Sequence, residues 1–145
     1  MQRVTAIYSY CQGVVLGAEL EALRLTGDIR HAERIERLLG AIETYCGDDK
    51  IIPSAGGGDG GLFAGVLARY LALIATDLPP IAGADELRRR AAAIVISSAD
   101  AAWTHHAEVE GLPLFGADWR QPATVPSKKG KDADFVAGAV NASEI

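Results

Sequence analysis

The chain has 145 residues, enough for one domain with a single hydrophobic core. Of these residues 49% are apolar and 23% are charged, a composition typical of a globular protein and not of a disordered one. The formal net charge of -5 argues against a nucleic-acid or anionic-membrane surface, because both require a basic patch.

The first half of the chain predicts two helices. Apolar residues recur at helical spacing from Val14 to Thr26, and Gly27 is a suitable stop. Asp28 can cap a second helix, which has charged residues on one face. Its other face follows the i, i+3, i+4, i+7 pattern through Ile35, Leu38, Leu39, Ile42 and Cys46. We expect this second helix to be amphipathic, with its charged face in water.

The second half predicts a buried helix, a further helix and then loops. A glycine-rich break from Gly47 to Gly61 precedes the segment from Leu62 to Thr76, which has apolar side chains on nearly all sides. Another helix is expected from about Ala84 to Trp103. The segment from Glu108 to Lys131 is typical of long loops, and a last short helix is expected from Asp132 to Asn141.

Buried and exposed helices therefore alternate along the chain, and no segment is a convincing strand. Without a β-α-β alternation there is no support for a parallel sheet. Successive hairpins with one buried and one exposed member favour an all-α fold. In a helical toroid or solenoid, such inner helices face a core and the outer helices face water.

Three patterns that could carry chemistry are better explained by local structure. The run from Gly56 to Gly61 matches G-x-G-x-x-G but lacks the preceding strand of a dinucleotide site, so we interpret it as a helix connector. His106 and Glu110 are four residues apart, but helix breakers follow and two ligands do not make a metal site. The adjacent acids Asp48 and Asp49 lie in a glycine-rich turn, which explains them without catalysis. We expect no metal and no cofactor.

The chain also lacks the sequence features of a secreted or membrane protein. Cys11 and Cys46 are too few for a disulfide framework or a zinc site. Tyr8, Tyr10 and Gln12 interrupt what would be the apolar run of a signal peptide. We find no stretch long and apolar enough to span a bilayer. The expectation is a cytoplasmic protein with free thiols and no membrane contact.

Two segments place aromatic and polar side chains close together. Tyr8, Tyr10 and Gln12 come just before the first helix, and Asp59 stands near Phe63 at the start of the buried helix. A sugar site needs such groups, because flat rings cover the C–H face of a pyranose while amides and carboxylates bind its hydroxyls. The alternative is that these aromatic residues belong to the core, which is the commoner role of aromatics at helical spacing.

Four motifs in order carry a more specific resemblance. Tyr-Ser-Tyr-Cys-Gln-Gly-Val occupies residues 8–14, and Leu-Arg-Leu-Thr-Gly-Asp occupies 23–28. Gly-Asp-Gly-Gly-Leu-Phe-Ala-Gly-Val-Leu-Ala-Arg-Tyr-Leu follows at 58–71, and later elements include Ala-Ala-Trp at 101–103 and Gly-Ala-Asp-Trp at 116–119. Together they resemble the motifs of glycoside hydrolase family 76, the endo-α-1,6-mannanases. The chain is similar to a C-terminal portion of that family, which implies part of an (α/α)6 toroid.

The resemblance also implies a retaining hydrolase with two neighbouring aspartates, which lie upstream of the Tyr-x-Tyr segment in that family. We therefore expect residues 1–145 to be a single partial toroid domain that lacks the catalytic pair and is impaired or inactive alone. Cys11 replaces the family's Asn and Ala64 replaces its Lys, which indicates relaxed demands on the site. No catalytic residue is assigned, and the implied substrate-binding residues are Tyr8, Tyr10, Gln12, Asp59, Phe63 and Trp119.

The expected ligand is α-mannan or a manno-oligosaccharide. A partial toroid leaves apolar helix faces uncovered, so we expect self-association or a complementary N-terminal half. Three alternatives stay open. The chain is a non-catalytic carbohydrate-binding or scaffold protein, a different toroid enzyme such as a sugar epimerase or another glycosidase that uses Asp59 or the histidines, or a truncated product without function.

Overall fold

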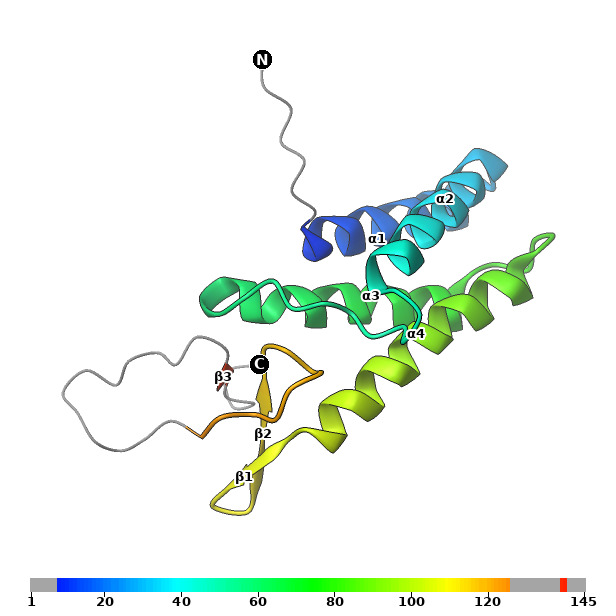
Figure 1. The fold of residues 1–145 in the computed structure, drawn as a ribbon. Coiled ribbons are helices and arrows are strands. Elements are labelled where there is room, and N and C mark those ends of the chain that lie inside the picture. The colour runs from blue at the N-terminus through cyan, green and yellow to red at the C-terminus, as the bar shows by residue number, and fades with distance from the viewer. Residues whose placement is uncertain (1–7, 126–138, 141–145) are drawn as a thin grey trace.

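The structure of this protein is a computed structural model that describes residues 8–125 and 139–140. Two helix hairpins pack against each other, and a small sheet lies at one end (Figure 1). The all-α class predicted from the sequence is confirmed, with helix hairpins of the kind that build an (α/α)6 toroid. The elements in chain order are α1 (Ser9–Thr26), α2 (Ile29–Cys46), the 3-10 turn η1 (Gly58–Leu62), α3 (Phe63–Asp77), α4 (Ala84–Thr104), β1 (Ala107–Val109), β2 (Leu112–Gly116) and β3 (Ala139–Val140).

The boundary between α1 and α2 lies where the sequence predicts it. Gly27 adopts a left-handed conformation with φ 68°, and its N–H donates to the carbonyl of Leu23 at 2.8 Å. The side chain of Asp28 accepts from the N–H of Arg30 at 3.0 Å and caps α2. At its other end α1 extends beyond the prediction, since it begins at Ser9 and not at Val14.

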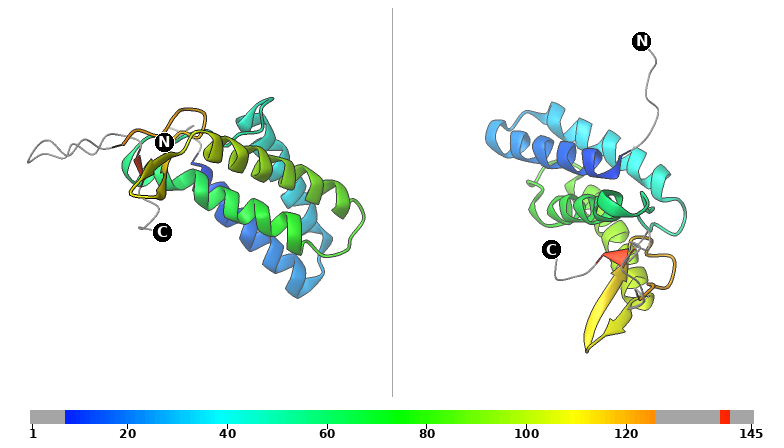
Figure 2. Two further views of the ribbon diagram at one scale, coloured as in Figure 1. Left: turned by 90° about the horizontal axis from the view of Figure 1, so that it is seen from below. Right: turned by 90° about the vertical axis from the view of Figure 1, so that its left-hand side faces the viewer.

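Helices α1 and α3 run side by side in the same direction, and two glycines allow their close approach (Figure 2). A β-carbon on Gly13 would lie 3.0 Å from the Cα of Leu67, and one on Gly17 would lie 2.4 Å from the ring of Tyr70. At Gly13 the two backbones meet, and at Gly17 the Tyr70 ring takes the space of a side chain. This contact brings the N-terminal ends of α1 and α3 together.

The core lies between the two hairpins. Helix α2 covers α1 and contributes Ile35, Leu39 and Ile42, while its charged face stays in water, as predicted. The completely buried hydrophobic side chains of the other helices are Leu16, Leu67, Leu71, Ile74, Ala91 and Ile94.

The prediction of long loops from Glu108 to Lys131 is wrong in part. Strands β1 and β2 form an antiparallel hairpin, and β2 also pairs with β3. The turn residues Glu110 and Gly111 both have positive φ, 54° and 79°, as a two-residue hairpin turn requires. The helix expected from Asp132 to Asn141 lies mostly outside the described residues, and Ala139–Val140 is a strand and not a helix.

The expectation that no stretch could span a bilayer is also wrong as far as length and composition go. The 20 residues from Gly58 to Asp77 form a helical stretch that is long and apolar enough. However, Leu67, Leu71 and Ile74 of this stretch are completely buried in the core that α3 shares with its neighbours. These three residues belong to a minority of the stretch, since 22% of it is buried.

Candidate functional site

An open aromatic cluster lies where the N-terminal ends of α1 and α3 meet. The ring centroids of Tyr10 and Phe63 are 4.4 Å apart, and Tyr8 lies 6.1 Å from Tyr10 and 6.4 Å from Phe63. These separations are typical of interacting aromatic rings. Tyr8 is 48% exposed and Tyr10 is 36% exposed, so the cluster offers ring surface to solvent. We call Tyr8, Tyr10 and Phe63 the tyrosine cluster.

Polar groups accompany the tyrosine cluster. The Oε1 atom of Gln12 is buried without a hydrogen-bond partner among the described residues, and Asp59 is exposed in η1 just ahead of Phe63. The pKa of Tyr10 is raised above its ordinary value, chiefly by a side-chain hydrogen bond with Cys11. In this bond the Tyr10 hydroxyl is the donor, and its oxygen lone pairs can still accept a hydrogen bond.

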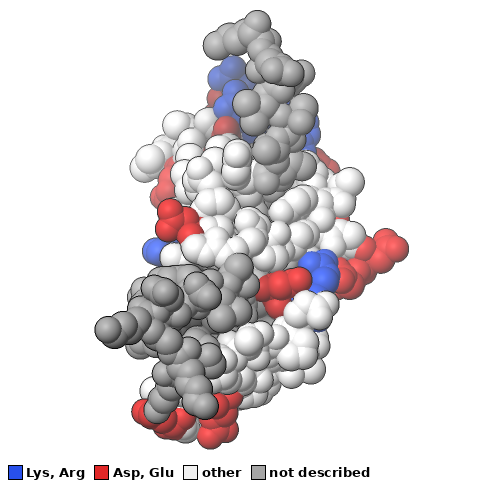
Figure 3. All heavy atoms as spheres, turned by 60° about the vertical axis from the view of Figure 1, so that its left-hand side comes forward, with Lys and Arg blue, Asp and Glu red and all other residues white. Residues whose placement is uncertain are grey.

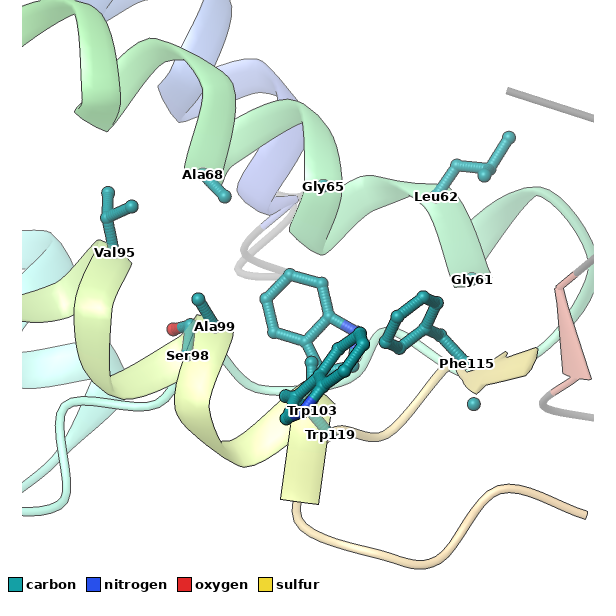
Figure 4. A pocket seen from close by; sticks show the side chains of 12 residues that line it. Gly61, Leu62, Gly65, Ala68, Val95, Ser98, Ala99, Trp103, Phe115 and Trp119 are labelled. Atoms are coloured by element: carbon teal, nitrogen blue, oxygen red, sulfur yellow. The ribbon is translucent and has the colours of Figure 1, made fainter. Parts of the chain in front are cut away.

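A pocket of about 420 Å³ lies on the other side of α3, between α3, α4 and β2 (Figure 4). Three aromatic rings gather below the first turns of α3, and small side chains of α4 form the opposite wall. Nearly all of the lining is apolar. It consists of Gly61, Leu62, Gly65, Ala68, Val95, Ser98, Ala99, Ala102, Trp103, Phe115, Gly116 and Trp119.

Aromatic packing between the end of α4 and the hairpin builds one wall of this pocket. The Trp103 ring stacks on His106 with centroids 4.7 Å apart and planes 24° apart. Phe115 of β2 lies 6.3 Å from Trp103 and 6.1 Å from His106. Trp103 is nevertheless 61% exposed, so part of its ring faces solvent.

Hydrogen bonds of Trp119 itself and of the next residue hold Trp119 in the pocket. The carbonyl of Trp119 accepts from Nδ1 of His105 at 2.8 Å. The next residue, Arg120, donates to both carboxylate oxygens of Asp49 at 2.8 Å and to the carbonyls of Cys46 at 3.1 Å and Ile51 at 2.6 Å. The Arg120 guanidinium holds the pKa of Asp49 down at about 2. This acid therefore stays ionised and serves as a structural anchor.

The comparison with protein families shows to which family the chain belongs. The model of glycosyl hydrolase family 76 matches residues 1–141. The chain belongs to glycosyl hydrolase family 76. No match was found among curated proteins or among solved structures.

The six predicted binding residues of this family 76 protein fall into two places. Tyr8, Tyr10 and Phe63 come together in the tyrosine cluster, with Gln12 on the adjoining turn of α1 and Asp59 in η1. Trp119 instead lines the pocket and packs on the core.

The sequence prediction does not include Phe115, and it relates Trp103 to the chemistry of a sugar site without including it among the six binding residues. Trp103 could have been assigned, because it stands in one of the family 76 motifs. Phe115 carried no signal, since it reaches the pocket only through the β hairpin.

Hydrolysis by this family 76 chain would require acidic groups at the site. None of the twelve side chains that line the pocket is a carboxylate. Asp49 forms an ion pair with Arg120. In the described ranges, no group of three or more His, Cys, Asp or Glu residues is placed to hold a metal ion. Much of the visible surface in Figure 3 carries no charged side chain.

Proposed function

We propose that this family 76 chain binds α-1,6-linked mannan through the tyrosine cluster and does not hydrolyse it alone. The observation that carries this proposal is the meeting of Tyr8, Tyr10 and Phe63 at the paired N-terminal ends of α1 and α3. Three rings from two helices form a surface on which the C–H face of a pyranose can stack.

Polar groups beside the rings supply partners for sugar hydroxyls. The Tyr10 hydroxyl oxygen and the exposed Asp59 carboxylate can both accept from sugar hydroxyls. A mannosyl unit on the cluster would thus meet both an apolar face and hydrogen-bonding groups.

Hydrolysis demands more than binding. A retaining glycosidase uses two carboxyl groups about 5–5.5 Å apart, and an inverting one uses a pair about 6.5–9.5 Å apart. Among the described residues, Asp59 lies in η1 four residues before Phe63, the pocket walls supply no carboxylate, and Asp49 is committed to Arg120. We therefore expect binding without turnover by this chain.

The test is to incubate the purified chain with α-1,6-linked manno-oligosaccharides and to measure both products and binding. We expect no cleavage, and calorimetric titration should show binding that Tyr10→Ala weakens about fivefold, the effect of losing one stacking interaction. Leu25→Ala is the matched control, because Leu25 is an 83% exposed apolar residue at the opposite end of α1.

Three outcomes would contradict the proposal in different ways. Cleavage by the parent that Asp59→Asn abolishes would mean that Asp59 belongs to an active acid/base pair. Equal weakening by Leu25→Ala would remove the tyrosine cluster from the binding site. Absence of any binding would overturn the mannan assignment.

A further inference from the structure

The pocket between α3, α4 and β2 differs in chemistry from the tyrosine cluster. Its volume of about 420 Å³ falls within the range of small-ligand sites. No charged side chain lines it, and the hydroxyl of Ser98, its one side-chain hydroxyl, already accepts from the N–H of Ile52 at 3.1 Å. A bare pyranose would leave most of its hydroxyls without partners here, which is costly.

The shape of the pocket favours a compact apolar group over a docked helix. Three separate elements line it, with Trp103 and Phe115 on one side and the small residues Gly65 and Ala99 on others (Figure 4). Walls on several sides suit a group that enters, whereas a docked helix requires a long open face.

The pocket and the tyrosine cluster share the first turn of α3. Phe63 belongs to the cluster, while its neighbours Leu62 and Gly65 line the pocket. The adjacent residues Leu62 and Phe63 belong to the pocket and to the cluster respectively, and consecutive Cα atoms are about 3.8 Å apart, so a ligand that passes around the N-terminal end of α3 can contact both. Its sugar would lie on the cluster and an attached apolar group would enter the pocket.

We propose that this pocket binds the apolar aglycone of a mannoside, that is, an alkyl or aryl group attached to the sugar that the tyrosine cluster holds. The inference rests on the proposed function for its sugar part only. Burial of the apolar group against Trp103, Phe115 and Trp119 supplies the affinity, and the sugar site supplies the selectivity for mannose.

Gly65 offers a direct way to fill the pocket. A β-carbon built on Gly65 would have no atom within 4 Å, so a larger side chain there enters open space. Gly65→Leu should therefore occupy the pocket without disturbing the helices. Ala41→Leu is the matched control, because it adds the same side chain at an exposed position of α2.

The chain contains its own reporter of occupancy. Its two tryptophans, Trp103 and Trp119, both line the pocket, so intrinsic fluorescence reports on that site alone. The experiment titrates the protein with octyl α-mannoside and methyl α-mannoside below micelle-forming concentrations and follows tryptophan emission. An α-1,6-linked mannotriose and octyl β-glucoside complete the set.

The expected result is that octyl α-mannoside binds about tenfold or more tightly than methyl α-mannoside, because burial of even two methylene groups contributes that factor. Its binding should shift the tryptophan emission to shorter wavelength. Gly65→Leu should remove the advantage of the octyl group and leave mannotriose binding unchanged, while Ala41→Leu should behave as the parent.

Several results would overturn the inference. One is equal affinity for the two mannosides, and another is an octyl advantage that survives Gly65→Leu. Sedimentation could also show that the parent is an oligomer and that Gly65→Leu is a monomer. That result would mean that a second copy of the chain occupies the pocket. A different result would overturn the mannan assignment but support an apolar binding pocket. In that result both octyl glycosides bind equally well, Gly65→Leu abolishes their binding, and mannotriose does not bind at all.

Discussion

The contact between α1 and α3 depends on Gly17, because the ring of Tyr70 lies where a β-carbon would be. In Gly17→Ala the new methyl group would lie 2.4 Å from Cε1 and 2.5 Å from Cδ1 of Tyr70. Carbon atoms in contact are normally about 3.5–4.0 Å apart, so the shortfall exceeds about 1 Å. The helices cannot simply separate along this line, since one turn earlier Gly13 packs on the backbone of Leu67 and Val66.

Two opposing effects set the size of the change. Overpacking of this kind costs about 1–3 kcal/mol. Replacing glycine by alanine inside a helix recovers about 1 kcal/mol. We therefore expect Gly17→Ala to lower the free energy of unfolding by up to about 2 kcal/mol, which corresponds to up to about 6 °C in Tm for a chain of this length.

Urea and thermal unfolding followed by circular dichroism would measure the effect. Gly40→Ala on α2 is the matched control, since its β-carbon would meet only Arg90 at an ordinary 3.8 Å. It should stabilise the protein by about 0.5–1 kcal/mol. Truncation of the ring in Gly17→Ala/Tyr70→Leu should recover part of the loss, as a double-mutant cycle would show. If Gly17→Ala stabilises the protein as much as Gly40→Ala does, the close packing of α1 on α3 is refuted.

Three further predictions concern the anchors of the loops. Arg120→Ala should lower the free energy of unfolding, measured in urea, by about 2 kcal/mol, because it removes charged hydrogen bonds to two carbonyls as well as to Asp49. Arg69→Ala is the control and should be nearly neutral, because Arg69 is exposed. The pKa of Asp49 is about 2 in the folded state, so its contribution to stability is complete above the ordinary value of about 3.9 and is lost as pH falls toward 2. Urea midpoints between pH 5 and pH 2 should fall less steeply for Asp49→Asn than for the parent, and parallel curves would exclude this role. Ser98→Ala should cost about 1–3 kcal/mol, because it leaves the buried N–H of Ile52 without its partner, whereas an equal loss in the neighbouring Ser97→Ala would contradict that reasoning.

Local signals in the sequence determined the helices and the family. Gly27 and Asp28 end one helix and begin the next through bonds within a few residues, so the boundary could be predicted without any tertiary contact. The apolar period of α2 predicted which face it buries. The ordered motifs indicated the family that the match over residues 1–141 confirms.

Only the tertiary structure decided where the candidate site lies. Arg120 and Asp49 are 71 residues apart. No pattern in the sequence shows which acidic residue pairs with an arginine at such a distance along the chain. The strands of the hairpin are too short to show an alternating pattern, so the sequence could not predict that Phe115 would join Trp103 in the pocket. Tyr8, Tyr10 and Phe63 were chosen for their chemistry, but it is the glycine contact between α1 and α3 that brings them to one surface. Helix ends depend on neighbours in the chain, whereas a site depends on which faces pack together, and that is decided across the whole core.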